Sequence, residues 1–80
     1  MTPLSQRLET ALLAAAGEGR AVVPVSFTID YGAAAEGAEA EIETRIDRAT
    51  KSLVFVSGEA RLADGRAAAT ASGVYGVRPA

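Results

Sequence analysis

The 80-residue sequence contains no cysteine and no histidine. The missing cysteines exclude a disulfide framework and a thiolate metal site, and the missing histidines exclude a Ser-His-Asp triad, a Cys-His dyad and a histidine-bound metal. Aromatic residues are scarce too, with two phenylalanines, two tyrosines and no tryptophan. A core this small supplies only about 3–5 kcal/mol, so such chains often depend on a partner. We therefore expect a single domain over residues 1–80 that self-associates into a homodimer or a higher homo-oligomer.

Long apolar runs and a strong charge of one sign are absent as well. The longest purely apolar stretch, Ala11–Ala16, is far shorter than the roughly 20 residues that span a bilayer. Ten acidic and eight basic residues give a net charge of −2 without a cluster of basic residues, which argues against binding to nucleic-acid phosphates. The first residues also lack the basic and apolar regions of a secretory signal. We expect a cytoplasmic protein with neither membrane nor nucleic acid as a partner.

Apolar residues first recur at the spacing of a helix. Leucines and alanines return every three or four positions, which predicts a helix over about residues 4–16. Thr2 and Pro3 suit its N-cap and first helical position, because proline there loses only an amide that would otherwise lack a partner. Gly17 suits the position just after the helix, where a positive φ is common.

From Gly19 onward the apolar period changes to two, which is typical of strands. We predict four strands, over about residues 21–31, 38–48, 52–63 and 66–77. Pro24 cannot donate a hydrogen bond to a neighbouring strand, so it suits a strand's start or a free edge. The run Leu53–Val56 is apolar on both faces, which predicts burial on two sides.

Asp64-Gly65 lies between two strand patterns and predicts a tight hairpin, specifically a type I′ turn with positive φ at both central residues. The last strand consists mostly of small residues, which allow a helix or another backbone to approach closely. The sequence therefore predicts an α+β fold, in which one long helix packs against an antiparallel sheet of about four strands.

Two groups of charged residues offer a ligand role and a simpler alternative. Glu39, Glu41 and Glu43 share one face of a strand and could bind a divalent cation, but no fourth ligand is evident. We favour a solvated face, and we expect neither a metal site nor a cofactor. Arg45, Arg48 and Lys51 surround the next turn, where they either meet a phosphate or simply keep the turn hydrated.

Glu9 is a different kind of candidate. It lies in the middle of the predicted helix, one position beyond Leu8 and on the same side as Leu12. If that side packs on the sheet or on a partner, Glu9 lies at the border of an apolar surface, where a carboxylate can be tuned as a general base or nucleophile. The alternative is a boundary glutamate that simply reaches water.

Five segments carry a further signal in their order and spacing. They are Leu8–Leu12 (LETAL), Val22–Tyr31 (VVPVSFTIDY), Ala38–Ile42 (AEAEI), Arg48–Val56 (RATKSLVFV) and Ala63–Arg66 (ADGR). Together with the final strand of small residues, they resemble the core of the hotdog-fold thioesterases of the PaaI-like group. The resemblance extends from Leu4 to Val77.

The resemblance implies a dimer with a continuous sheet and an acyl-CoA thioester site at the subunit interface. An Asp or Glu on the central helix acts in that family as base or nucleophile, and Glu9 matches this position. Thr10 follows it as a small polar neighbour. Arg48 and Lys51 would contact the nucleotide end of coenzyme A.

The chain also departs from the family pattern. PaaI-like enzymes have a further strand and a His-Gly-Gly loop before the helix, and a glycine amide there polarises the thioester carbonyl. Here only Met1-Thr2-Pro3 precede the helix, and Pro3 has no amide hydrogen. Losing one such donor typically costs about 10²–10³ in rate. We therefore regard the chain as an N-terminally shortened relative, or as one whose native start lies upstream of Met1.

Two functions follow from these observations. The first is an acyl-CoA thioesterase-like hydrolase that hydrolyses or binds acyl thioesters at a subunit interface. The alternative is a catalytically inactive, truncated hotdog module that binds an acyl ligand or serves only self-assembly.

Overall fold

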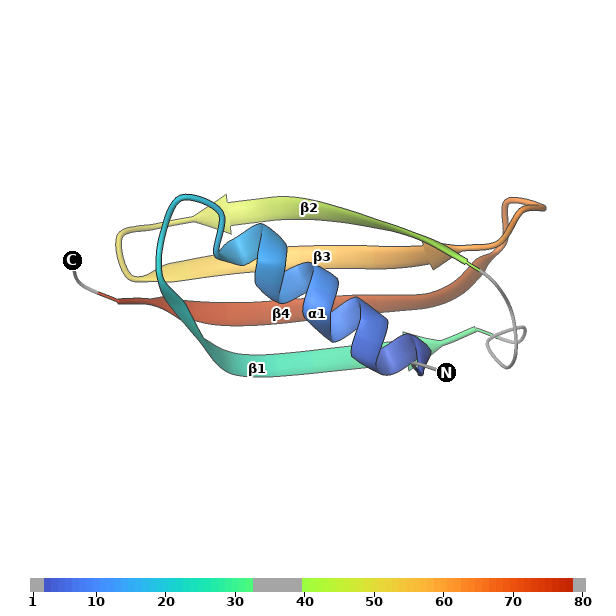
Figure 1. The fold of residues 1–80 in the computed structure, drawn as a ribbon, viewed down its shortest axis with the longest axis horizontal. Coiled ribbons are helices and arrows are strands. Elements are labelled where there is room, and N and C mark those ends of the chain that lie inside the picture. Colours follow the sequence, from blue (N-terminus) through green and yellow to red (C-terminus); the bar gives the residue numbers. More distant parts are fainter. Residues whose placement is uncertain (1–2, 33–39, 79–80) are drawn as a thin grey trace.

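The computed structural model describes residues 3–32 and 40–78, which form one helix and four strands (Figure 1). In chain order these are α1 (Leu4–Ala16), β1 (Val22–Tyr31), β2 (Glu41–Ala49), β3 (Leu53–Arg61) and β4 (Ala67–Val77). The four strands form a single antiparallel sheet, and α1 packs across one face of it. The predicted fold class, one helix on an antiparallel sheet of about four strands, is confirmed.

The start of α1 differs by one position from the prediction. Pro3 is itself the N-cap, with extended backbone angles (φ −60°, ψ 150°), and it makes no side-chain capping hydrogen bond. Its carbonyl accepts a hydrogen bond from the Arg7 amide at 3.1 Å, which opens the helical ladder. The predicted cap, Thr2, lies outside the described residues. Proline performs this role because only its carbonyl is needed there.

The end of α1 also corrects an expectation. Gly17 keeps a negative φ of −85°, because its amide still donates to the Leu13 carbonyl (2.9 Å) as in a regular helical turn. The positive φ, +76°, falls on Gly19 instead. The chain therefore reverses two residues later than the sequence pattern indicated.

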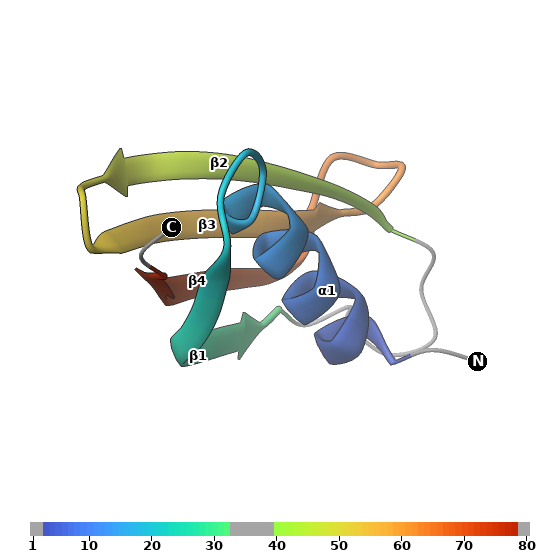
Figure 2. The same cartoon turned by 60° about the vertical axis from the view of Figure 1, so that its left-hand side comes forward.

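The order of the strands in the sheet is β1-β4-β3-β2. The first strand therefore lies beside the last, and β1 and β2 are the two edges (Figure 2). Each edge strand contains an irregularity, between Pro24 and Ser26 in β1 and between Ile46 and Arg48 in β2. Pro24 thus lies in a strand with a free edge, where its missing amide hydrogen breaks no pairing on the outer side.

The core lies between α1 and the central strands. Leu8, Leu12 and Ala16 of the helix are fully buried, as are Val54 and Ala60 of β3. Each buried leucine is worth roughly 1.5–3 kcal/mol relative to an exposed one, so this single layer carries much of the stability.

Two glycines let the helix and one aromatic ring approach the sheet. A Cβ added at Gly58 would lie 2.5 Å from Leu12 Cδ1, so this leucine rests directly on the β3 backbone. A Cβ added at Gly73 would lie 2.6 Å from both Cε2 and Oη of Tyr75, so the tyrosine ring folds back over its own strand. The close approach of the helix thus occurs over a glycine of β3, whereas the glycine of β4 makes room for an aromatic ring of its own strand.

The β3–β4 hairpin forms at the predicted residues but with a different turn. Only Gly65 has positive φ (+92°), and the Gly65 amide donates to the Leu62 carbonyl at 2.9 Å. The Leu62 amide in turn donates to the Arg66 carbonyl at 2.8 Å. This is a three-residue loop, a type I turn followed by glycine, so Asp64 is spared the positive φ that a type I′ turn would require.

The face of the sheet opposite α1 is covered by no other described element (Figure 2). Val54 and Val56 point toward the helix and are buried, whereas Leu53 and Phe55 alternate with them and are only half-buried. The expectation that both faces of this run are buried is therefore wrong for the single chain. Neighbouring strands shield Leu53 and Phe55 laterally, but none of the described elements lies over them.

Candidate functional site

Glu9 is the single acidic residue of α1. Its side chain is exposed, although the preceding Leu8 is fully buried. Within the described residues, the Glu9 carboxylate takes part in no hydrogen bond and no ion pair. It therefore presents a free carboxylate at the border of the buried stripe of the helix.

Tyr75 of β4 lies beneath the helix and is a site residue that the sequence reasoning missed. It is only 2% exposed, and its hydroxyl has no hydrogen-bond partner among the described residues. Burial raises the pKa of this hydroxyl above its ordinary value of 10.0, and the negative charge of Glu9 raises it further. The hydroxyl is thus a firmly protonated donor within the electrostatic reach of Glu9. No sequence motif marks it, because its position depends on the space above Gly73.

The other predicted site residues do not gather around Glu9. Thr10 is exposed on the next helical position, about 100° further around the axis. Arg48 is exposed near the end of β2 and pairs in register with Phe55, so it lies on the face of the sheet away from α1. Lys51 is exposed in the β2–β3 turn. The two cations therefore form a separate basic region at one end of the sheet.

Arg45, the third cation of the predicted turn cluster, is already paired. Its Nε donates to Asp47 Oδ1 at 2.9 Å, and Ser57 Oγ donates to the same oxygen at 3.1 Å. The Ser57 hydrogen bond and then the Arg45 guanidinium hold the pKa of Asp47 below its ordinary value. This cluster is exposed and stabilises the irregular stretch of β2, which makes Arg45 less suited than Arg48 or Lys51 to a ligand.

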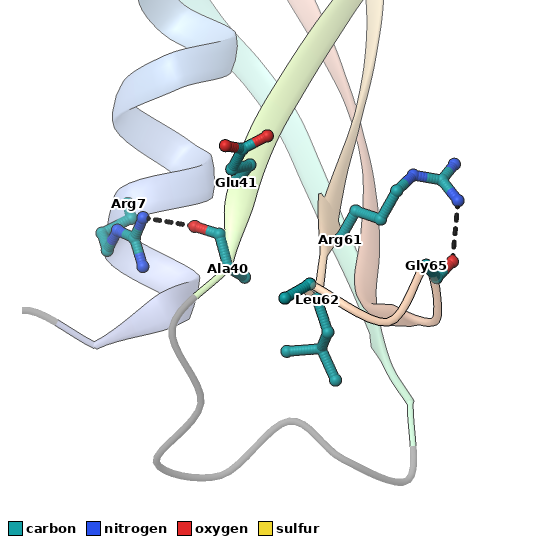
Figure 3. A pocket seen from close by; sticks show the side chains of 7 residues that line it. Arg7, Ala40, Glu41, Arg61, Leu62 and Gly65 are labelled. Carbon is teal, nitrogen blue, oxygen red and sulfur yellow. Dashed lines mark hydrogen bonds between the residues drawn. The ribbon is translucent and has the colours of Figure 1, made fainter.

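A pocket of about 770 Å³ lies between the first half of α1, the start of β2 and the β3–β4 hairpin (Figure 3). Its lining consists of Arg7, Ala40, Glu41, Arg61, Leu62, Ala63 and Gly65. Arg7 Nη2 donates to the Ala40 carbonyl at 2.9 Å, and Arg61 Nη1 donates to the Gly65 carbonyl at 2.9 Å (Figure 3). Arg61 also pairs with Glu59. Arg7 comes from α1 and Arg61 from the end of β3, so the packing of the helix on the sheet makes them line one pocket, which no local sequence signal could indicate.

The predicted glutamate face gives no metal centre among the described residues, where no group of three potential ligands lies close enough to hold an ion. Glu39 lies outside those residues. Glu41 and Glu43 are exposed on the sheet face away from the helix, opposite Arg61 and Glu59 respectively.

One helix packed on one face of a four-stranded antiparallel sheet defines the class: a hotdog-like α+β domain. The family model of the thioesterase superfamily matches residues 7–69, most of the chain. The chain therefore belongs to the thioesterase superfamily. No curated protein matches it.

Solved structures agree with this fold at low sequence identity. A Bacillus halodurans protein solved with CoA superposes with a TM-score of 0.81 at 20% identity, over 92% of this chain and 52% of that one. The AziG protein of S. sahachiroi gives a TM-score of 0.80 at 23% identity, over 95% and 66% respectively. A thioesterase of Haemophilus influenzae gives 0.70 at 12% identity, over 98% and 63%. The chain thus spans about half to two thirds of the length of these structures.

In the part of the chain that the structure describes, no helix has both the length and the apolar character needed to cross a membrane.

Proposed function

We propose that this protein hydrolyses acyl-CoA thioesters at an interface between two copies, with Glu9 as the general base. The observation that carries the proposal is the free Glu9 carboxylate, the one acidic group on α1, next to the fully buried Leu8. A carboxylate that is accessible yet bordered by apolar surface can take a proton from water beside an acyl chain. A carboxylate fixed in a local ion pair would be less available for this chemistry.

The reaction needs only water and the thioester. Glu9 accepts a proton from a water molecule as the water oxygen attacks the carbonyl carbon. The tetrahedral intermediate then collapses, the carbon–sulfur bond breaks, and the departing thiolate takes up the proton. The products are a carboxylic acid and free CoA.

The β1 edge suits a second copy of the chain better than the β2 edge does. Val25 of β1 is 62% exposed, and Leu13, which follows Glu9 by one helical turn, is 38% exposed. The β2 edge instead carries a row of exposed charged residues, a feature that opposes strand pairing. Pairing along β1 would continue the sheet and bring a partner surface toward the Glu9 side of the helix.

Coenzyme A is the leaving group that we propose. A structural relative solved with CoA supports this class of substrate. The exposed cations Arg48 and Lys51 would contact its phosphates, and Thr10 would be a polar neighbour of the thioester. The proposal keeps the cytoplasm as the location.

Glu9→Gln tests the proposal directly, with Glu18→Gln as a matched control on an exposed glutamate just after the helix. We expect hydrolysis of at least one of a panel of short, medium and aromatic acyl-CoAs. Loss of a general base should lower kcat about 10²–10⁴-fold in Glu9→Gln, while the control keeps its rate. Sedimentation should give the same oligomer size for all three proteins.

Equal rates in the wild type and Glu9→Gln would remove Glu9 from the reaction. Absence of turnover on every substrate would favour the alternative, a catalytically inactive module. Calorimetric titration with acyl-CoA would then separate an acyl-binding protein, which gives heat of binding, from one that serves only self-assembly.

A further inference from the structure

Tyr75 has a hydroxyl that the fold buries without a partner among the described residues. The residue is 2% exposed, and within the described residues its Oη neither donates nor accepts a hydrogen bond. Leaving such a group unpaired is costly, and native proteins rarely do so without a function or an internal water. The ring cannot relieve the cost by turning, because it is packed against the Gly73 backbone beneath the helix.

The place of this hydroxyl in the sheet points toward Glu9. Leu12 rests on Gly58 of β3, and Gly58 pairs in register with Ala71 of β4. The helix crosses the sheet diagonally, and its N-terminal part lies nearer β1 (Figure 1). Arg7 reaches from α1 to the Ala40 carbonyl just before β2, and Glu9 follows it by two residues, about 200° further around the helix axis, so Glu9 lies on the opposite side of the helix, toward β4 and β1.

The two groups are chemically complementary. Tyr75 offers a hydroxyl hydrogen and lacks an acceptor, whereas Glu9 offers carboxylate oxygens and has no donor among the described residues. The Glu9 charge also acts on the hydroxyl and helps to keep it protonated. A rotation of the flexible Glu9 side chain, or one bridging water, would satisfy both groups.

We propose that Tyr75 is a positioning residue, whose hydroxyl donates a hydrogen bond to the Glu9 carboxylate, directly or through one water, and so orients this carboxylate toward the thioester. This role rests on the proposed function. The hydrogen bond itself does not, because it belongs to the folded chain.

Thermal unfolding of Tyr75→Phe in two backgrounds tests the hydrogen bond without reference to activity. Phenylalanine keeps the ring on Gly73, so the variant retains the packing. With Glu9 present, loss of the bond should lower Tm by about 4–8 °C. In a Glu9→Ala background the hydroxyl has no acceptor, so the same change should leave Tm unchanged or raise it. An equal shift in both backgrounds would show that the two groups do not meet and would overturn the proposal.

Steady-state kinetics test the positioning role. Tyr75→Phe should lower kcat about tenfold or more with KM unchanged, because only the orientation of the base is lost. Ser72→Ala, which removes an exposed hydroxyl from the same strand, should leave kcat and Tm at their wild-type values. An unchanged kcat in an active protein would overturn the positioning role. Absence of turnover in the wild type would overturn the proposed function and any catalytic role of Tyr75, and the two-background Tm comparison would still decide whether the groups meet.

Discussion

Gly73→Ala should destabilise the protein through a clash with one identified ring. The added methyl carbon would lie 2.6 Å from Tyr75 Cε2, 2.6 Å from its Oη and 2.8 Å from its Cζ. An aromatic ring cannot bend to relieve such contacts. It would have to leave its rotamer and enter the layer occupied by Leu8 and Leu12, both fully buried.

Overpacking of this kind typically costs about 1–3 kcal/mol. Replacing glycine also restricts the unfolded chain, which returns roughly 0.4–1 kcal/mol. A net loss of about 1–2 kcal/mol follows, and in a domain of this size it lowers Tm by roughly 4–16 °C. Urea unfolding followed by circular dichroism would measure the free energy, with Tm taken from a parallel thermal scan.

Gly76→Ala is the matched control on the same strand. A methyl group there would meet Val23 Cγ2 at 3.5 Å and Val25 Cγ2 at 3.7 Å, which are ordinary contacts. This variant should unfold within about 0.5 kcal/mol of the wild type. In a Tyr75→Leu background, which lacks the ring, Gly73→Ala should lose most of its cost. If Gly73→Ala is as stable as the wild type, or equally costly without the ring, the packing of Tyr75 over Gly73 is refuted.

Two further predictions concern association and pH. Val25 on the β1 edge is 62% exposed, and Val25→Lys should weaken self-association about tenfold or more in sedimentation equilibrium. The control Ile46→Lys on β2 should have little effect. The opposite ranking of the two variants would place the interface on the β2 edge. Because the pKa of Tyr75 is raised, the folded protein holds the proton of the Tyr75 hydroxyl more tightly than the unfolded chain does. The stability that this difference contributes is complete below the ordinary pKa of 10.0 and is lost as pH rises through the folded pKa. Tyr75→Phe should therefore lose less unfolding free energy than the wild type between about pH 8 and about pH 11, and identical pH slopes would show that Tyr75 is not buried.

Local patterns in the sequence accounted for the secondary structure and the fold class. The helical spacing of leucines and alanines and the alternation from Val22 onward depend only on neighbours along the chain. Asp64-Gly65 located the hairpin for the same reason, because few residue pairs accept a tight reversal. The exact turn geometry was less accessible, because Asp-Gly suits a type I′ turn and also a three-residue loop with positive φ at the glycine alone. Only the hydrogen bonds around Leu62 and the φ of Gly65 show that the chain forms the three-residue loop.

Glu9 could also be selected from the sequence, as the one acidic residue on the predicted helix. The exposure of the Glu9 side chain and its lack of a described partner could not be predicted from the sequence, because they depend on which strands lie beneath that helix. The same holds for Arg7 and Arg61, which are 54 positions apart in the sequence and line one pocket only because α1 packs beside the start of β2, which pairs with β3.

The amino-acid sequence by itself therefore determined the elements, their apolar faces and the chemistry that the absent cysteine and histidine exclude. The tertiary structure decided which elements became neighbours. β1 pairs with β4 across nearly the whole chain, and this pairing leaves β1 and β2 as edges. The packing of α1 on the sheet buries Tyr75, whose hydroxyl has no hydrogen-bond partner among the described residues. Such features arise from contacts between residues far apart in the chain, and no short stretch of sequence contains them.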